Sequence, residues 1–332
     1  MKKALRSSVG LGLCLMLALV MALALGGCSA GRDDAQSART EGSGADGAAS
    51  LPAIKVGTLQ TDDLLPLWVA EAEGLLTQGG LNVEIQSFQS AQEQIAAVTA
   101  GEIDAIMTDL VVPVQLTAAG TPMRAVTIMQ GAPAGVVAGK DSGISTVSDL
   151  AGVKTGCSSP TILEFIYDKA LTEAGVPADQ IQTEEIKKLP VRLEMLQQGQ
   201  IKAAALPWTL WQLAVQQGAV PVLDEAQDGS YTSTVLEFRD EWLQQENAAG
   251  AIKTLRDIWD QAVDLINASP DSYRELLVEK AKLPEPLRDS YPVRHYPATA
   301  PVPQEQVEEV VNWMVDKGYL NEALAYAELI YE

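Results

Sequence analysis

Residues 96–108 read AAVTAGEIDAIMT, and residues 194–206 read EMLQQGQIKAAAL. In each stretch a run with helical character stops at a glycine, Gly101 in the first and Gly199 in the second. An isoleucine and an alanine follow at the same offsets, and the chain then continues as an apolar strand. The same local structure is therefore predicted twice, 98 residues apart.

The segments around these two stretches repeat as well. The first half reads as strand, helix, strand, helix and strand, in residues 53–60, 67–78, 81–88, 92–100 and 103–108. The second half gives the same order in residues 152–159, 160–175, 180–188, 190–199 and 200–208. Gly57 in the first strand matches Gly156, so the two halves agree in register to within one residue. Short apolar strands that alternate with helices predict parallel sheets, and hence an α/β protein with two similar lobes.

The arrangement of the two lobes predicts where a ligand binds. In open α/β sheets, ligands bind beyond the carboxyl ends of the strands. Two such edges that face each other form one cleft, which closes by hinge motion. We expect residues 53–133 and 230–332 to form the first lobe and residues 134–229 the second, with crossovers near Pro133 and Ser230. The C-terminal part of the first lobe reads as helices that pack back on that lobe.

The N-terminal 27 residues have the features of a secretory signal. Basic residues precede an uncharged apolar run from Val9 to Leu25, and small residues precede Cys28. The sequence Leu-Gly-Gly-Cys resembles a bacterial lipobox, which implies that Cys28 becomes the lipid-carrying mature N-terminus. An uncleaved membrane anchor is the alternative, because 17 apolar residues are near the lower limit for a spanning helix. Residues 28–52 are poor in large aliphatic side chains and predict a flexible tether. Either interpretation places the rest of the chain outside the cytoplasm.

The charge of the chain excludes several classes of partner. The net charge is −21, and it becomes −24 without the three cationic residues of the signal peptide. Such a field repels nucleic acid and provides no polybasic patch for a membrane, so we expect membrane attachment through the lipid only. With three cysteines and one histidine, the sequence predicts neither a disulfide framework nor a metal site. We expect a monomer without a cofactor.

Two longer stretches resemble a known family. Residues 66–109, PLWVAEAEGLLTQGGLNVEIQSFQSAQEQIAAVTAGEIDAIMTD, are similar to the opening of the nitrate/sulfonate/taurine-type solute-binding proteins of ABC importers, a family that also includes thiamine-pyrimidine binders. Residues 142–156, SGISTVSDLAGVKTG, resemble the entry to the second lobe of those proteins. The resemblance covers Ile54 to Leu223. It implies the type II periplasmic-binding-protein fold, delivery of a small-molecule ligand to an ABC permease and ATPase complex, and no catalysis.

Polar and aromatic residues follow the predicted strands, where the cleft is expected. Hydroxyl groups at a helix N-terminus suit an anion, because free N–H groups and the helix dipole favour negative charge. Asp109 suits an amine or amidine, Arg192 can fork onto an anionic ligand, and Trp208 offers a flat wall for a ring. The predicted ligand-binding residues are Thr58, Gln60, Trp68, Ser90, Thr108, Asp109, Ser158, Ser159, Thr161, Arg192 and Trp208.

The sequence leaves a structural alternative open for most of these residues. Trp68 fits the core on the first helix as well as it fits the cleft. Ser90, Asp109 and Thr161 fit ordinary helix caps. Arg192 fits a surface salt bridge. The residue types alone do not separate these roles.

The ligand is expected to be a small organic anion or a heterocycle, such as a sulfonate, taurine, nitrate or a thiamine-type pyrimidine. Two tryptophans and the hydroxyl-rich helix N-terminus favour a planar or anionic organic molecule over an inorganic ion. If Trp208 is not in the site, an aliphatic sulfonate held by Arg192 and the turn at 158–161 is preferred. Two other functions stay open, namely a ligand-sensing lipoprotein that docks on a receptor and an enzyme on the same fold.

Overall fold

The computed structural model describes residues 50–131, 134–224, 231 and 233–332. Contacts within the chain separate residues 1–47 from a compact unit, residues 48–332, which we call the body. The predicted signal peptide, Cys28, most of the tether and the crossovers near Pro133 and Ser230 lie outside the described residues. Among the residues that are described, no helix is both long and apolar enough to cross a membrane.

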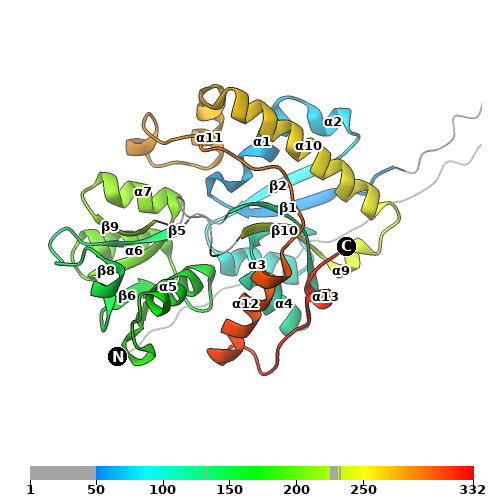
Figure 1. Ribbon diagram of the computed structural model, residues 1–332. Coiled ribbons are helices and arrows are strands. Elements are labelled where there is room, and N and C mark those ends of the chain that lie inside the picture. Colours follow the sequence, from blue (N-terminus) through cyan, green and yellow to red (C-terminus); the bar gives the residue numbers. More distant parts are fainter. Residues whose placement is uncertain (1–49, 132–133, 225–230, 232) are drawn as a thin grey trace, which may run out of the picture. The chain divides into compact units, whose positions relative to one another are not determined.

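The body contains two five-stranded sheets (Figure 1), which confirms the predicted two-lobed α/β fold class. The first has the order β2-β1-β3-β10-β4, formed by β1 (Ile54–Leu59), β2 (Val83–Phe88), β3 (Ala105–Asp109), β4 (Met123–Gly131) and β10 (Ser233–Arg239). The second has the order β7-β6-β8-β5-β9, formed by β5 (Ala134–Ala138), β6 (Lys154–Cys157), β7 (Gln182–Glu185), β8 (Ala203–Pro207) and β9 (Val220–Asp224). We call the first sheet with its helices lobe I and the second sheet with its helices lobe II.

The helices divide between the lobes as follows. Lobe II has α5 (Ile162–Glu173), α6 (Leu189–Gln197) and α7 (Trp208–Gln216). Lobe I has α1 (Leu65–Ala72), α2 (Leu75–Gln78), α3 (Ala91–Thr99) and α4 (Val111–Ala118), and after β10 it has α9 (Asp240–Leu243), α10 (Ala248–Ala268), α11 (Arg274–Lys280), α12 (Gln304–Asp316) and α13 (Tyr326–Leu329).

The two sheets repeat one pattern of strand pairing. In lobe I, β1 is parallel to β2 and β3, while β10 is antiparallel to β3 and β4. In lobe II, β6 is parallel to β7 and β8, while β5 is antiparallel to β8 and β9. The registers agree, because Gly57 lies opposite Ile106 and Gly156 lies opposite Ala204. The carboxyl ends of β1, β3, β6 and β8 are the edges at which a ligand is expected.

The repeated sequence motif has a physical cause in each lobe. Gly101 and Gly199 adopt φ angles of 74° and 68°, the left-handed conformation that ends α3 and α6. The isoleucine two residues later packs on the glycine of the first strand of its lobe. A Cβ atom at Gly57 would lie 2.4 Å from Ile103 Cδ1, and one at Gly156 would lie 2.6 Å from Ile201 Cδ1. Each motif therefore ends a helix and seats the following strand against a neighbour that has no side chain.

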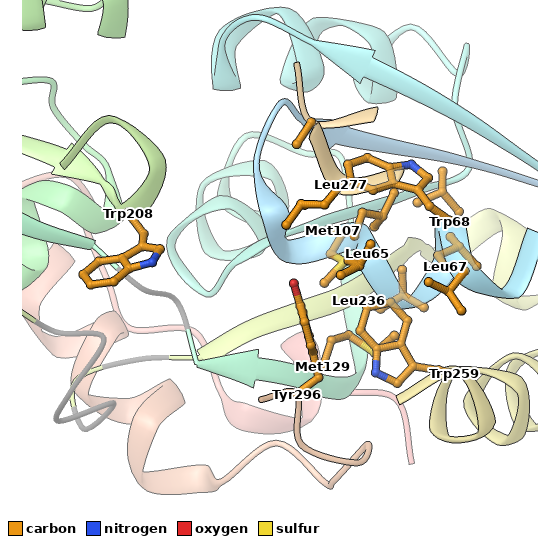
Figure 2. Close-up of a cluster of buried hydrophobic side chains, with 14 of the residues drawn as sticks. Leu65, Leu67, Trp68, Met107, Met129, Trp208, Leu236, Trp259, Leu277 and Tyr296 are labelled. Atoms are coloured by element: carbon orange, nitrogen blue, oxygen red, sulfur yellow. The ribbon is translucent and has the colours of Figure 1, made fainter. Parts of the chain in front are cut away.

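The C-terminal helices complete the core of lobe I. Helix α10 is amphipathic and buries Ile252, Leu255 and Ile258. Figure 2 shows Trp259 of α10 in one cluster with side chains of α1 and with Leu236 of β10. Burial of such side chains is worth about 1.5–3 kcal/mol each, so this face is a main source of stability.

The expectation that the chain after residue 230 is helical is wrong for residues 233–239, which form β10. This strand contains Glu237, which suggests a surface position but is fully buried. Burial raises the pKa of Glu237 well above its usual range, and a neutral carboxyl group fits a buried strand. Helix α12 also reaches lobe II, where Trp313 Nε1 donates a hydrogen bond of 2.9 Å to Asp168 Oδ2 of α5.

Candidate ligand-binding site

A cavity of about 200 Å³ is lined by residues of both lobes. Lobe I contributes the loop after β1, the N-terminal turn of α3, the end of β3 and part of α4. Lobe II contributes residues 158–163, Lys187, Leu189 and Pro207. The cavity thus lies at the carboxyl ends of parallel strands in both sheets, as expected for this class of fold. It is smaller than the 300–1,000 Å³ typical of pockets for drug-sized ligands, which favours a small solute.

Six of the predicted residues line this cavity, namely Ser90, Thr108, Asp109, Ser158, Ser159 and Thr161. Two of them, Ser90 and Thr161, are also helix N-caps, and Asp109 accepts a hydrogen bond from the first residue of α4. Ser90 Oγ accepts from the Glu93 N–H (3.2 Å), Thr161 Oγ1 accepts from the Glu164 N–H (3.4 Å), and Asp109 Oδ1 accepts from the Val111 N–H (2.8 Å). Cavity lining and hydrogen bonding to a helix start, which were proposed as alternatives, therefore occur at the same residues. Both roles fall where a strand is followed by a helix.

The two predicted tryptophans lie outside the cavity lining. Trp68 is 2% exposed and belongs to the core of lobe I, where Figure 2 shows it on α1. Trp208 stacks on Trp211, with ring centroids 4.9 Å apart and planes at 16°. The two indoles are three residues apart on α7 and share one helix face, so Trp208 packs on its own helix. Trp208 is thus absent from the cavity lining, and its role as a stacking wall for a ring stays a prediction.

Three other predicted residues are also absent from the lining. Thr58 is buried, and its hydroxyl donates to the Leu59 carbonyl (3.1 Å). Gln60 is half-buried in the loop after β1. Arg192 is fully buried. Its guanidinium N–H groups donate to backbone carbonyls and to the Ser158 hydroxyl, so these donors are already used within the protein. Arg192 supports the cavity wall through Ser158 and does not line the cavity.

The structure adds polar lining residues that the sequence did not single out, which are Thr61, Asp63, Gln92, Gln115, Lys187 and Thr234. Both carboxylate oxygens of Asp63 accept hydrogen bonds. Thr61 Oγ1 donates to Oδ2 (2.8 Å), and Arg294 Nη2 donates to Oδ1 (3.1 Å). Arg294 also pairs with the buried Asp62 (2.7 Å). The two adjacent acids in the loop after β1 could have indicated a polar site from the sequence. Their partner, Arg294, could not have been found in this way, because it lies 231 residues after Asp63.

The two walls of the cavity differ in electrostatic character. On the lobe I wall, burial raises the pKa of Asp63 to about 6, with Asp62 adding to the shift and Arg294 opposing it. Burial likewise raises the pKa of Asp109 to about 6, although backbone N–H groups at the start of α4 oppose the shift. The lobe II wall has three hydroxyl residues, Lys187 and the N-terminus of α5. Lobe I therefore presents acids, and lobe II presents an ammonium group, two serine hydroxyl groups and the positive end of a helix dipole, while the Thr161 hydroxyl donates to the Ser158 carbonyl (2.7 Å).

Cysteine and histidine are absent from the cavity lining formed by the described residues. Cys157 lies directly before the lining segment, but it is buried and its thiol pKa is raised to about 12 by burial. A thiol with this pKa is a poor nucleophile at neutral pH. The polar groups at hand can bind and orient a small molecule.

Comparison with solved structures shows the same fold in proteins of several functions. The periplasmic aliphatic sulphonate binding protein SsuA from Escherichia coli is 20% identical, with 84% of this chain and 92% of that chain covered and a TM-score of 0.71. The periplasmic nitrate-binding protein NrtA from Synechocystis PCC 6803 is 16% identical, with 82% and 83% covered and a TM-score of 0.64. The desulfurization enzyme DSZB is 14% identical, with 83% and 96% covered and a TM-score of 0.61.

A match by sequence identifies the family. No curated protein matches the chain. The family model described as NMT1/THI5 like matches residues 61–272, which is more than half of the chain and includes most of the residues that line the cavity. The resemblance to nitrate- and sulfonate-type binding proteins that the motifs indicate is confirmed by this match and by the structural neighbours. The chain therefore belongs to the NMT1/THI5-like family.

Proposed function

We propose that this protein is the solute-binding component of an ABC importer, which captures a small molecule in the cavity between its lobes and delivers it to a permease. The observation that carries the proposal is the cavity lined from both lobes, with Gln115 Nε2 of lobe I donating to the Pro160 carbonyl of lobe II (3.0 Å) at its wall. A ligand that contacts both walls favours the closed arrangement, because it gains its contacts only when the lobes meet.

Recovery of the natural ligand tests this function. The full-length protein, purified in mild detergent, should release a small molecule on denaturation, which mass spectrometry identifies intact. Adding that molecule back at about 100 times its Kd should stabilise the protein by about 2.7 kcal/mol, seen as a rise in Tm. If no compound recovered from the cell stabilises the protein, the proposal is wrong. If the recovered compound is chemically converted on incubation, the protein is an enzyme.

The predicted lipid anchor is part of the same proposal. Replacing Cys28 with alanine should release the protein from membranes, because a mature chain of strong negative charge has no electrostatic attachment to anionic lipids. Cys14→Ala is the matched control, since Cys14 lies inside the predicted signal peptide and its loss should leave the protein anchored. Fractionation with a high-salt wash measures both variants. A Cys28→Ala protein that still sediments with membranes contradicts the anchor.

A further inference from the structure

Two carboxylates enter the cavity from separate segments of lobe I. Asp63 lies in the loop after β1, and Asp109 is the last residue of β3. Asp63 is balanced by Arg294, which it shares with Asp62. No salt bridge reaches Asp109 within the described part of the chain. The titratable groups that interact with it electrostatically are two further acids: Asp63, which raises the pKa of Asp109, and Glu237, whose own pKa Asp109 raises. Asp109 is half-buried and accepts a hydrogen bond from the Val111 N–H, but it has no cation beside it among the described residues, and a ligand can supply the missing positive charge.

The opposite wall suits a group of the other kind. Ser158, Ser159 and Thr161 place hydroxyl groups at the start of α5, and Lys187 adds an ammonium group. Helix α5 has 12 residues, so its N-terminal N–H groups carry a full helix dipole. Both walls also include apolar side chains, such as Ile95 and Val112 of lobe I and Leu163 of lobe II. A molecule that fits both walls has a donor for the acids of lobe I, an acceptor for the start of α5 and some apolar surface.

We infer that the ligand carries a protonated amine or amidine, which binds against Asp63 and Asp109, and an anionic or acceptor group, which binds at the N-terminus of α5. This inference rests on the proposed function and narrows it to one class of solute. A bare oxyanion such as nitrate, or a simple alkylsulfonate, meets the α5 wall equally well but faces two acids of its own sign. The cavity therefore discriminates by the cationic end of the ligand.

The affinity for such a ligand depends on pH in a definite direction. The groups that face or adjoin the acids are Asp62 and Arg294 beside Asp63, Glu237 near Asp109, and Lys187 on the opposite wall. Asp63 and Asp109 have pKa values of about 6, so at pH 5 each is mostly protonated and attracts a cation weakly. Binding of an amine should therefore strengthen from pH 5 to pH 7.5, by about tenfold for each acid that must ionise. A simple anion should show the opposite trend.

Matched pairs of probes test the inference without knowledge of the natural ligand. Each pair differs only in the cationic group. One series compares ω-aminoalkanesulfonates with ω-hydroxyalkanesulfonates of two to four carbons, and another compares benzamidine with benzamide. Binding is measured by calorimetry on the full-length protein, with EDTA present so that no divalent cation occupies the carboxylates. We expect the best cationic member to bind at least tenfold more tightly than its neutral-ended partner.

The variants assign that discrimination to the acids. Asp109→Asn should bring the ratio within each pair to within threefold of unity while retaining the hydrogen bond from the Val111 N–H, because the amide oxygen of asparagine can accept it as the carboxylate does. Asp63→Asn gives a second, independent test. Asp104→Asn is the matched control, since Asp104 precedes the same strand, accepts a hydrogen bond from the Lys55 N–H and does not line the cavity. It should leave the ratio unchanged.

Several outcomes would overturn the inference. The first is that the hydroxy or amide member of a pair, or nitrate, binds as tightly as the cationic member. The second is that the preference for the cationic member survives in both Asp109→Asn and Asp63→Asn. The third is that none of the cationic members binds. In each case recovery of a natural ligand that stabilises the protein would leave the proposed function standing. If no ligand is recovered either, the proposed function fails with the inference.

Discussion

Replacing Arg192 with alanine should lower the free energy of unfolding of the body by about 3–5 kcal/mol, the cost of breaking a buried charged network. Arg192 is fully buried at the start of α6. Its Nε and Nη2 atoms donate to the Ile186 carbonyl (3.0 and 2.6 Å), Nη1 donates to the Ala205 carbonyl (2.7 Å), and Nη2 also donates to Ser158 Oγ (2.9 Å). The side chain thus joins β8, the segment after β7 and the cavity wall.

The cost follows from the groups that the substitution leaves behind. Two buried carbonyls and one hydroxyl lose their donor, and each unpaired group costs about 1–3 kcal/mol. The void left by the arginine side chain adds to this loss. Arg192→Lys should recover little, because a lysine ammonium cannot reproduce the planar fork that reaches three segments at once.

Denaturant unfolding followed by circular dichroism measures the effect. Lys188→Ala is the control, since Lys188 is an exposed cation four residues earlier and caps α6 without a side-chain hydrogen bond. Its loss should change the stability by less than about 0.5 kcal/mol. An Arg192→Ala protein that unfolds at the same denaturant concentration as the parent would show that the network contributes nothing.

Arg192 also shows where inference from sequence reaches its limit. The residue type and its place between a strand and a helix indicate a group that forks onto an acceptor near the cleft, and the structure contains such a fork. The acceptors are backbone carbonyls of the protein itself. Which acceptor an arginine reaches depends on tertiary packing, and no local pattern specifies it. The same holds for Trp208, which turns onto Trp211.

The parts of the site that were predicted follow local rules. Hydroxyl residues after β6 and a serine before α3 line the cavity because the step from strand to helix and the helix caps fix those positions within a few residues. The binding roles of these residues stay predictions. Asp63 was missed because its importance depends on burial and on Arg294, which comes from a distant segment of the C-terminal region.

The fold was predicted in its repeated part for a similar reason. Ile103 packs on Gly57, and Ile201 packs on Gly156. Each isoleucine follows a helix-ending glycine, Gly101 or Gly199, at the same offset, so the sequence pattern indicates both contacts. By contrast, β10 joins lobe I after the chain has completed lobe II, and it pairs antiparallel with β3 and β4. Its central Glu237 breaks the apolar pattern, so only the tertiary environment identifies the strand.

Two acids on α5 of lobe II contact the C-terminal segment of lobe I. Lys317 Nζ lies 3.0 Å from Glu164 Oε1 and 2.8 Å from Asp168 Oδ2. Tyr319 donates to both oxygens of Glu164 (2.9 Å each), and Trp313 Nε1 donates to Asp168 Oδ2 (2.9 Å). Burial opposes the charged form of Lys317, but its contacts with the two acids outweigh this, so its pKa is raised. This cluster is one charged part of the contact between the lobes, beside the ion pair of Lys169 on α5 with Glu309 on α12 (2.7 Å).

Replacing Lys317 with methionine should therefore destabilise the body by about 2–3 kcal/mol, the lower part of the range for a broken buried pair, because the lysine is one-third exposed and water screens it. The substitution leaves Glu164 and Asp168, one helical turn apart and largely buried, without a cation. Lys253→Met is the control. Lys253 forms an exposed ion pair with Asp257, so its loss should lower the free energy of unfolding by less than about 0.5 kcal/mol. Denaturant unfolding compares the two variants. Adding Glu164→Gln to Lys317→Met should restore part of the loss, because it removes one of the two unpaired charges. Equal stability of the Lys317→Met and Lys253→Met proteins would show that the cluster does not hold the lobes together.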